Sequence, residues 1–256
     1  MWDIFNLKNL LLAFLVFAPL EWLFALRAGR NKLSAGWGLD VVYAMTNAVL
    51  VKFGLIIILT AALTVTEVAI PGSLRLWVGA QPMWIQLPAI ILIADTGYYA
   101  GHRISHKVPW LWKFHAIHHS SEQLDWLASM RNHPVDLTLT KSLSLLPVFA
   151  LGFSNANIVI YGTMFFWLSA FIHSNIKISI GPLKWLVSSP QFHHWHHANH
   201  AEAFDKNFAA LLPFLDWLLG TMHMPGNALP ERYGTPEPVP RSFVDQFFYP
   251  LRRTEM

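Results

Sequence analysis

The stretch "PMWIQLPAIILIADTGYYAGHRISH", residues 82–106, joins an apolar run to two histidines. The apolar part, residues 82–102, is long enough to cross about 30 Å of hydrocarbon as a helix that rises about 1.5 Å per residue. His102 and His106 stand at i and i+4, so they lie on the same face of that helix. The stretch therefore predicts a membrane-embedded helix that ends in a pair of imidazoles.

Three further apolar stretches are similar in length and composition: 5–26, 41–65 and 142–172. The first has Glu21 near its end and a weakly basic start, which favours a spanning helix over a cleaved signal peptide. The last contains "GFSN", residues 152–155, where Gly and Asn favour a turn, so it predicts two helices that enter and leave by the same face. We therefore expect an all-α integral membrane protein with four or five membrane-embedded helices.

The composition agrees with a membrane protein. Charged residues make up 13% of the 256 residues and hydrophobic residues 54%, whereas a soluble domain carries about 25% charged residues. The basic residues are scattered, so no nucleic-acid-binding tail is expected. Cysteine is absent from the sequence, which excludes disulfides, thiolate zinc sites, iron–sulfur clusters and haem attached through cysteine. Any metal must therefore be held by histidine, carboxylate or water.

The loops predict the orientation in the membrane. The loop after the first apolar stretch carries three basic residues, whereas the loop 66–81 carries one. The three are Arg27, Arg30 and Lys32. Because cytoplasmic loops carry the excess of Lys and Arg, residues 27–38 are expected to be cytoplasmic, and two crossings then return the chain to that side before His102. We expect a multi-pass protein, in a bacterial inner membrane, with a cytoplasmic histidine-rich helical cap.

Two more histidine clusters follow along the chain. "HAIHH", residues 115–119, and "HHWHH", residues 193–197, place histidines at i, i+3 and i+4. At about 100° per residue, each triad falls within about a 100° arc on a helix, and His194 points away from its neighbours. Together with the first pair, the triads supply more imidazoles than the three or four that a tetrahedral zinc takes, so two metals fit that supply. The eight candidate ligands are His102, His106, His115, His118, His119, His193, His196 and His197.

The other late histidines divide into two sets. His133 in "RNHPVD" and His173 in "FIHSNI" are expected to be further ligands. The remaining ones are expected outside the site; they are His194, His200 and His223.

One carboxylate is a candidate for orienting a ligand. Asp95 precedes His102 by seven residues, hence about two turns along the same helical face. A buried carboxylate there is expected to orient a ligand imidazole through its free N–H. The other nearby carboxylates are expected to be solvated or to cap helices; they are Glu122, Asp125, Asp136 and Asp205.

Five segments taken together resemble one protein family. They are "DTGYYAGHRISH", "WKFHAIHHSSE", "RNHPVD", "HSNIKISIGPLKWLVSSPQFHHWHH" and "DKNFAALLPFLDWLLGT". In order and spacing, over residues 95–221, they look like the fatty acid hydroxylase/sterol desaturase superfamily, whereas residues 1–90 match only in being apolar spans. The resemblance implies a membrane enzyme with a histidine-bound di-iron centre that uses O₂ and two electrons to hydroxylate or desaturate a lipid.

The resemblance also implies the ligand set. Position by position, it includes the eight clustered histidines, with His133 and His173 as the two intervening ones. Hydroxylases of the sphingolipid type pair two histidines as HxxxH in the fourth region, whereas this chain has Ser169 four residues before His173 and Lys177 four residues after it. Whether His133 or a water held by Asn175 completes the set stays open.

A single domain is expected over residues 1–256. It has transmembrane helices in 1–94, the di-iron catalytic region in 95–223 and an irregular, proline-rich tail in 224–256. The chain contains no cysteine-ligated cluster and no GxGxxG fingerprint, so electrons are expected from a separate ferredoxin, rubredoxin or cytochrome b5-like donor with its reductase.

Two other classes of protein remain as alternatives. A histidine-rich membrane metal transporter or metal-binding protein would place its ligands at mid-membrane. A zinc-dependent membrane hydrolase would need a catalytic carboxylate such as that of HExxH, a motif absent from the sequence. A lipid oxygenase is therefore favoured, hydroxylation before desaturation, with fatty acyl, sterol and related lipids all open as substrates.

Overall fold

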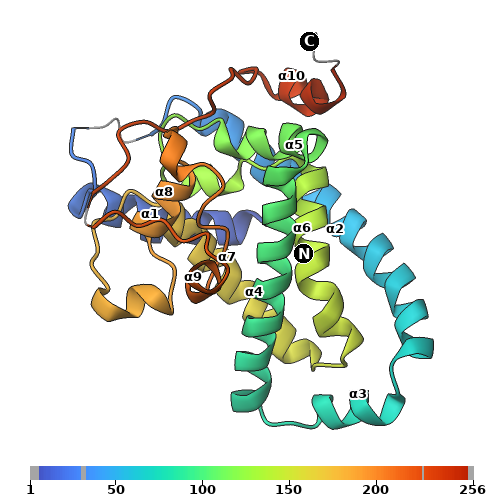
Figure 1. The fold of residues 1–256 in the computed structure, drawn as a ribbon. Coiled ribbons are helices and arrows are strands. Elements are labelled where there is room, and N and C mark those ends of the chain that lie inside the picture. Colours follow the sequence, from blue (N-terminus) through green and yellow to red (C-terminus); the bar gives the residue numbers. More distant parts are fainter. Residues whose placement is uncertain (1–5, 30–32, 227, 253–256) are drawn as a thin grey trace.

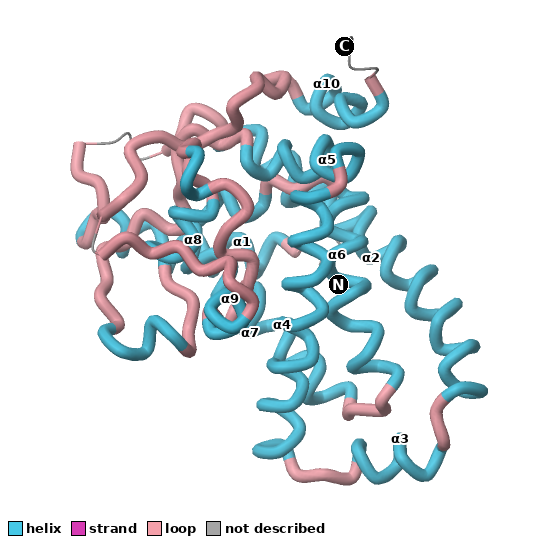
Figure 2. Tube along the Cα trace, viewed as in Figure 1, coloured by secondary structure: helices cyan, strands magenta, loops and turns pink. Residues whose placement is uncertain are grey.

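The computed structural model describes residues 6–29, 33–226 and 228–252. Within these residues every named element is a helix, and the β contacts are two isolated bridges, Ala25–Ile176 and Ala198–Tyr233. Figure 2 shows short connections at one end of the molecule and longer loops at the other. The predicted all-α class is therefore confirmed.

Five helices build the elongated part of the molecule (Figure 1). They are α2 (Trp37–Ala69), α3 (Gly72–Gly79), α4 (Met83–Lys107), α6 (Pro134–Ala150) and α7 (Asn155–His173). Figure 1 shows α4 and α6 side by side, with α3 lying across the lower end between α2 and α4. α2 also packs against α6, and α7 packs against α4. The predicted helices in 41–65, 82–102 and 142–172 correspond to α2, α4 and the α6–α7 pair.

Two glycines bring α4 and α6 together. A Cβ atom at Gly97 would lie 2.2 Å from the carbonyl oxygen of Leu143, and one at Gly101 would lie 3.0 Å from the Leu143 side chain. The G-x-x-x-G spacing puts both glycines on one face, where small residues let two helix backbones approach closely in a membrane. The same approach brings the hydroxyl of Ser105 on α4 within 2.9 Å of the Asp136 carboxylate in the first turn of α6.

Two turns close the opposite end of the molecule. Gly152 follows α6 with a φ of 81°, a conformation that favours glycine, and it stands in the predicted hinge. Gln86, near the start of α4, donates to the carbonyl oxygen of Gly79 and accepts the N–H of Ser154. The α6–α7 turn is therefore fixed where α4 begins, about 24 Å along that helix from His102 at about 1.5 Å per residue.

Shorter elements surround the other end of α4. α5 (Pro109–His119) and α8 (Pro190–His196) both begin with proline, whose fixed φ and missing N–H suit the first helical position. Ser189 caps α8, because its hydroxyl accepts the N–H of Phe192. The remaining short elements are η1 (Trp126–Met130), η2 (Gly181–Trp185), η3 (Ala201–Ala203), α9 (Phe214–Leu218), α10 (Phe243–Phe248) and η4 (Tyr249–Leu251).

The first helix, α1 (Leu7–Leu23), packs against this end of the molecule. Ala13 and Phe17 join a buried cluster with Trp126 of η1 and with residues of α7. The carboxylate of Glu21 accepts the backbone N–H groups of Trp126 and Asn175. These bonds satisfy two buried donors, so α1 helps to hold the loops that surround the histidines.

Two described helices are long and apolar enough to cross a membrane, Trp37–Thr66 and Asn155–His173. The pair α3 and α4, bent by 115°, would make a third span. The described residues thus offer two or three candidate spans against the four or five membrane-embedded helices predicted, because α1 and α6 have only 17 residues each. Two predictions depend partly on residues outside the described ranges. The first predicted span begins at Phe5, and the predicted orientation uses Arg30 and Lys32.

The C-terminal segment contains more structure than predicted. It crosses the histidine end of the molecule (red in Figure 1) and contains α10 and η4. Phe243 of α10 packs edge-on against Tyr43 of α2, with ring centroids 5.0 Å apart. The prediction of an irregular 224–256 tail is therefore wrong for 243–251, where aromatic contacts with distant residues stabilise short helices that lack a periodic apolar pattern.

Candidate metal centre

Nine histidines converge into two groups near the end of α4. Within each group, one nitrogen from each imidazole lies within 4.8 Å of the others. The five-histidine group consists of His102, His106, His115, His119 and His196, and the four-histidine group of His118, His173, His193 and His197. Eight of these residues are buried, and the His106 side chain is 7% exposed.

The two HxxHH triads supply both groups. On α5, His115 and His119 face the five-histidine group, whereas His118 faces the other. On α8 the division is reversed, because His196 faces the five-histidine group while His193 and the adjacent His197 face the other. At about 100° per residue, positions i and i+4 lie about 40° apart and position i+3 lies on the far edge of the arc, so each triad can serve two centres.

The nitrogen atoms are spaced like ligands of a common ion. In the five-histidine group the Nε2 atom of His115 lies 3.0 Å from that of His102 and 3.2 Å from that of His119. In the four-histidine group the Nε2 atom of His193 lies 3.0 Å from that of His173 and 3.1 Å from that of His197. Two nitrogens bound to one ion at about 2.1 Å and at right angles are about 3.0 Å apart.

Hydrogen bonds to the other ring nitrogen fix the tautomer. The Nδ1 atom of His102 lies 2.7 Å from the carbonyl oxygen of Phe208, and that of His118 lies 2.9 Å from the carbonyl oxygen of Arg131. His173 and His196 make the same kind of bond, to Ser169 and Lys206. A carbonyl oxygen only accepts, so each Nδ1 carries the proton and each Nε2 presents a lone pair to its group.

Lone pairs about 3 Å apart repel unless a cation lies between them. The Nε2 atoms of neutral His118 and His173, 3.2 Å apart, cannot hydrogen-bond to each other, because both Nδ1 atoms donate to carbonyl oxygens. The donor set therefore fits bound metal ions. Five imidazoles in one group also exceed the four ligands of a tetrahedral zinc site.

Burial keeps these imidazoles neutral. It lowers the pKa of His118 to about 3, with the neighbouring imidazole of His115 as the next cause. Burial likewise holds the pKa of His119, His193 and His197 well below the usual range, and nearby imidazoles lower it further. Metal ligation requires the neutral ring, so these nitrogens are available as donors at neutral pH.

Asp136 supports one of the ligand candidates. Its carboxylate lies 2.9 Å from the Nδ1 atom of His115 and accepts a second bond from Ser105. Both Asp136 and His115 are buried. The expectation that Asp136 is solvated or capping was incomplete, because its partner comes from α5 and is 21 positions away in sequence. One sequence feature could have indicated that Asp136 supports a ligand: it stands in the first turn after "NHP", close to the expected ligands.

Asp95 does not contact an imidazole, contrary to the expectation. Its two carboxylate oxygens accept the backbone N–H groups of Ala210, Leu211 and Leu212. Asp95 lies two helical turns from His102, about 10 Å along α4. The 208–212 loop packs against α4 beside Asp95. Asp95 therefore holds the loop whose Phe208 carbonyl binds His102.

His133 lies outside both groups, which contradicts its expected role as a ligand. Its Nδ1 atom accepts the N–H of Val135 and its Nε2 atom bonds the carbonyl oxygen of Phe247 at 3.1 Å. The alternative of a water held by Asn175 has no support either, because the Asn175 amide bonds the backbone N–H and carbonyl of Arg27.

The expected non-ligands lie outside both groups as well. His194 points away from them, as predicted, but it is buried and bonded to the hydroxyl of Tyr233 at 2.8 Å. The ring of His200 accepts backbone N–H groups of Glu231 and Arg232, and His223 packs against Trp195. His194 thus faces a neighbouring loop rather than either histidine group. Asp125 caps η1, and Asp205 pairs with Lys107 at 2.6 Å, as expected for exposed or capping carboxylates.

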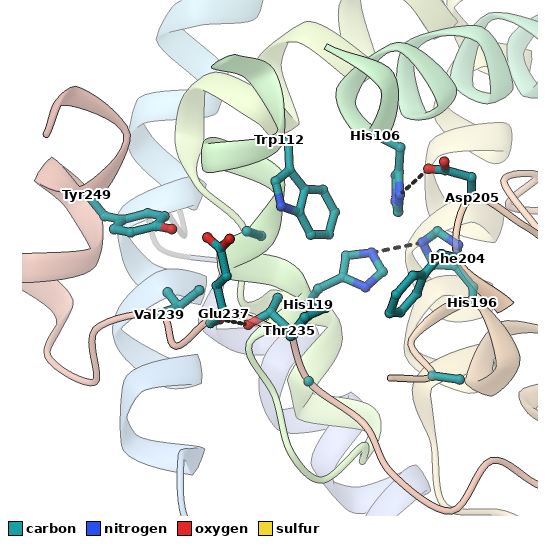
Figure 3. Close-up of a pocket in the computed structure, with 14 residues that line it drawn as sticks. His106, Trp112, His119, His196, Phe204, Asp205, Thr235, Glu237, Val239 and Tyr249 are labelled. Atoms are coloured by element: carbon teal, nitrogen blue, oxygen red, sulfur yellow. Dashed lines mark hydrogen bonds and ion pairs between the residues drawn. The ribbon is translucent and has the colours of Figure 1, made fainter. Parts of the chain in front are cut away.

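A pocket of about 330 Å³ opens onto the five-histidine group (Figure 3). His106, His119 and His196 form part of its wall, with Trp112 and Phe204 beside them. Figure 3 shows the carboxylate of Asp205 next to His106, 3.6 Å from its Nδ1 atom. The cavity beside the four-histidine group measures only about 10 Å³.

The fatty acid hydroxylase family matches residues 87–221, more than half of the chain. The chain belongs to the fatty acid hydroxylase family. Its matched segment contains all nine histidines of the two groups.

Several relatives of known activity are similar to this family member. Ornithine lipid hydroxylase OlsE of Rhizobium tropici is 30% identical over 193 residues, which cover 75% of this chain and 58% of that protein. Alkylglycerol monooxygenase of Homo sapiens is 29% identical over 147 residues, 57% of this chain and 32% of that protein. Cholesterol 25-hydroxylase of Rattus norvegicus is 29% identical over 138 residues, 52% of this chain and 45% of that protein. The matches thus span less than two thirds of these relatives, and no solved structure matches the chain.

Proposed function

We propose that this chain is a membrane-embedded, O₂-dependent lipid hydroxylase whose two histidine groups hold two iron ions. The observation that carries the proposal is the convergence of nine imidazoles into two groups beside a pocket. The reaction inserts one atom of O₂ into a C–H bond of the lipid, while two electrons and two protons reduce the other atom to water. Iron would supply the redox chemistry that zinc lacks.

The proposed ligands are the nine histidines of the two groups. The chain's own residues hold them in place: Asp136 and four backbone carbonyls fix the rings through Nδ1 and leave Nε2 free to coordinate. Such outer partners orient metal ligands and raise their basicity. Burial excludes water from the four-histidine group, whereas the pocket admits substrate to the five-histidine group.

The membrane placement follows the apolar helices. We propose that α2, α4 and α7 are embedded, that α6 is buried among them, and that α3 lies along the membrane surface opposite the histidine end. The exposed face of α3 supports this, because Leu76 and Trp77 are 77% and 64% exposed. The histidine end would face the cytoplasm of a bacterium, in its inner membrane, since the loop 66–81 carries few basic residues. Division into transmembrane helices 1–94, a di-iron region 95–223 and a C-terminal segment 224–256 is part of the proposal.

The proposed substrates are lipids with a reactive C–H bond near the membrane surface. The relatives' names include an ornithine lipid, an alkylglycerol and cholesterol. All three names describe hydroxylation or monooxygenation, so hydroxylation is favoured over desaturation. A ferredoxin, rubredoxin or cytochrome b5-like protein with its reductase is the proposed electron donor.

Lipid mass spectrometry tests this function. Cells that express the chain are grown under isotopically labelled O₂, and their lipids are compared with those of cells that express the His115→Ala chain. The proposal expects a lipid that gains one labelled oxygen atom only with the unaltered chain. The same lipid profile in both strains would contradict it.

Thiol labelling tests the orientation, because the chain contains no cysteine. Glu122→Cys lies at the histidine end, where the Glu122 side chain is 78% exposed, and Ser73→Cys lies on α3. An impermeant maleimide is expected to label the Ser73→Cys chain in intact cells and the Glu122→Cys chain only after lysis. The reverse pattern would contradict the cytoplasmic placement.

A further inference from the structure

The pocket over the five-histidine group has a second wall that the catalytic residues do not provide. It is made by the C-terminal part of the chain, through Gly234, Thr235, Pro236, Glu237, Val239 and Tyr249. Figure 3 shows Thr235 and Glu237 next to His119 and Trp112. We call residues 228–251 the strap. No regular element holds its middle part in place, because residues 234–242 form loop.

His200 holds the start of the strap. Its Nε2 atom accepts the backbone N–H of Glu231 at 3.1 Å and that of Arg232 at 3.4 Å. The N–H of Asn199 donates to the carbonyl oxygen of Arg232 at 2.9 Å. The strap is therefore attached three to four residues after the end of α8.

His194 holds the next residue of the strap. Its Nε2 atom faces the carbonyl oxygens of His173 and Ser174, at 3.3 and 3.1 Å, so Nε2 carries the proton. Its Nδ1 atom therefore accepts a hydrogen bond from the hydroxyl of Tyr233, at 2.8 Å. This tautomer is opposite to that of the proposed ligands, and it links the strap to the end of α7.

His133 holds the far end of the strap. Its Nδ1 atom accepts the N–H of Val135, so Nε2 carries the proton and donates to the carbonyl oxygen of Phe247 at 3.1 Å. The His133 ring also packs between the rings of Phe114 and Phe247, with centroids 4.8 and 5.2 Å away. The loop over the pocket is thus attached on both sides.

We propose that the strap is the substrate-selecting wall of the pocket, and that His133, His194 and His200 are positioning residues that hold it. Three of the four histidines outside the metal groups bind the strap, and the fourth, His223, does not. A pocket of about 330 Å³ holds only part of a lipid, so the position of this wall decides which part reaches the metal centre. The inference rests on the proposed function, because it takes a lipid as the occupant of the pocket.

Loosening the strap at its anchors tests the proposal, and the substitution in the pocket wall, Thr235→Cys, is the same in every chain compared. Tyr233→Phe removes one hydroxyl, and His200→Ala removes one acceptor, whereas His200→Gln supplies a carbonyl oxygen in its place. His223→Ala is the matched control, because it removes an imidazole that binds no strap residue. Each change is made in the full chain with Thr235→Cys as the sole thiol.

The first readout is the rate at which a maleimide labels the Thr235→Cys chain, with and without a detergent dispersion of the cell's lipid extract. Tyr233→Phe and His200→Ala are expected to speed labelling about fivefold, the factor for losing one hydrogen bond from a local opening equilibrium. His200→Gln and His223→Ala are expected to leave the rate unchanged. The lipid extract is expected to slow labelling of the chain with an intact strap and to protect the loosened chains less.

The second readout is kinetic. For the lipid hydroxylated by the unaltered chain, KM is expected to rise about fivefold in the loosened chains, with kcat within about twofold and metal content unchanged. Unchanged labelling would overturn the anchoring role, and faster labelling with an unchanged KM would overturn the selecting role. If the unaltered chain forms no product, the proposed function fails. The labelling rates with and without lipid extract then decide the strap proposal. It is supported if the lipid slows labelling less in the loosened chains than in the chain with an intact strap. It is contradicted if the lipid slows labelling in none of the chains.

Discussion

The five-histidine group and the four-histidine group share the helices α5 and α8 but have different surroundings. The first borders a pocket of about 330 Å³, whereas the cavity beside the second measures about 10 Å³ and is lined mostly by residues of α7 and of the 208–212 loop. Among the described cavities, the one beside the five-histidine group is thus large enough for more than a water molecule. Under the proposed function, substrate would be attacked on that side, while the four-histidine group is held within the protein interior.

The two groups also differ in how their imidazoles are held. In the five-histidine group, carboxylates lie beside His115 and His106, from Asp136 at 2.9 Å and Asp205 at 3.6 Å. In the four-histidine group, His118 and His173 bond carbonyl oxygens, and the buried Nδ1 atoms of His193 and His197 have no hydrogen-bond partner in the described structure. A carboxylate raises the basicity of a ligand more than a carbonyl does, so the five-histidine group is the more electron-rich site.

The largest effect is expected from removing one nitrogen from either group. His196→Ala and His197→Ala alter adjacent residues that face different groups. Each variant is expected to lose measurable turnover and the ion of its own group, because water replaces a neutral nitrogen donor poorly. Metal content and product formation are measured side by side, with His223→Ala as the control that keeps both ions. If both variants kept both metal ions, the assignment of His196 and His197 as ligands of two separate sites would be wrong.

A smaller effect is expected from the carboxylate beside His115. Asp136→Asn is expected to lower activity or metal affinity about 10- to 100-fold, the range for outer partners of metal ligands. Asp95→Asn is the matched variant, since Asp95 is equally buried but bonds only backbone N–H groups. It is expected to lower the unfolding temperature and to leave metal affinity unchanged. If both variants lost metal equally, the bond from Asp136 to His115 would not be what supports metal binding.

A still smaller, structural effect is expected at the contact between α4 and α6. Gly97→Ala would place a Cβ atom 2.2 Å from a backbone oxygen of α6 and is expected to cost about 3 kcal/mol of unfolding free energy. Because α4 carries His102 and His106, metal in the five-histidine group should be lost first on heating. Gly162→Ala on α7, where a Cβ atom meets nothing within 4 Å, is the control. Equal destabilisation by the two variants would contradict the close-packing account.

The smallest effect is expected from His194, which stands between ligands of both groups in sequence. His194→Ala removes buried hydrogen bonds to Tyr233 and to the end of α7. It is expected to lower stability by about 1–2 kcal/mol while both metal ions stay bound. Thermal unfolding and metal analysis of the same preparation measure this. Loss of metal at unchanged stability would mean that the ring directions in α8 are assigned wrongly.

The sequence predicted those parts of the site that depend on local periodicity. The helices around 41–65 and 82–102, the turn at 152–155 and the shared faces of the eight clustered histidines follow from apolar length, turn residues and i, i+3, i+4 spacing. The ninth group member, His173, was expected as one of the two histidines between the clusters. The sequence also allowed a prediction that each triad is divided between two groups, because the i+3 side chain lies at the edge of the arc that the triad covers around the helix axis.

The remaining features depend on contacts between distant segments. Asp136 was missed because its partner lies on α5, and Asp95 was assigned wrongly because nothing local places the 208–212 loop beside α4. His133 follows the expected motif order, yet both of its ring nitrogens bond other groups. The number of membrane-embedded helices stays a prediction, because two or three candidate spans are found among the described residues and α1 packs on the loops near Trp126 and Asn175.

Metal analysis of the purified chain of residues 1–256 measures whether the two histidine groups hold two iron ions. Two iron ions per chain are expected, with about one left in His196→Ala and in His197→Ala. One zinc ion per chain, or a metal content that does not change when either group loses a nitrogen, would contradict this expectation.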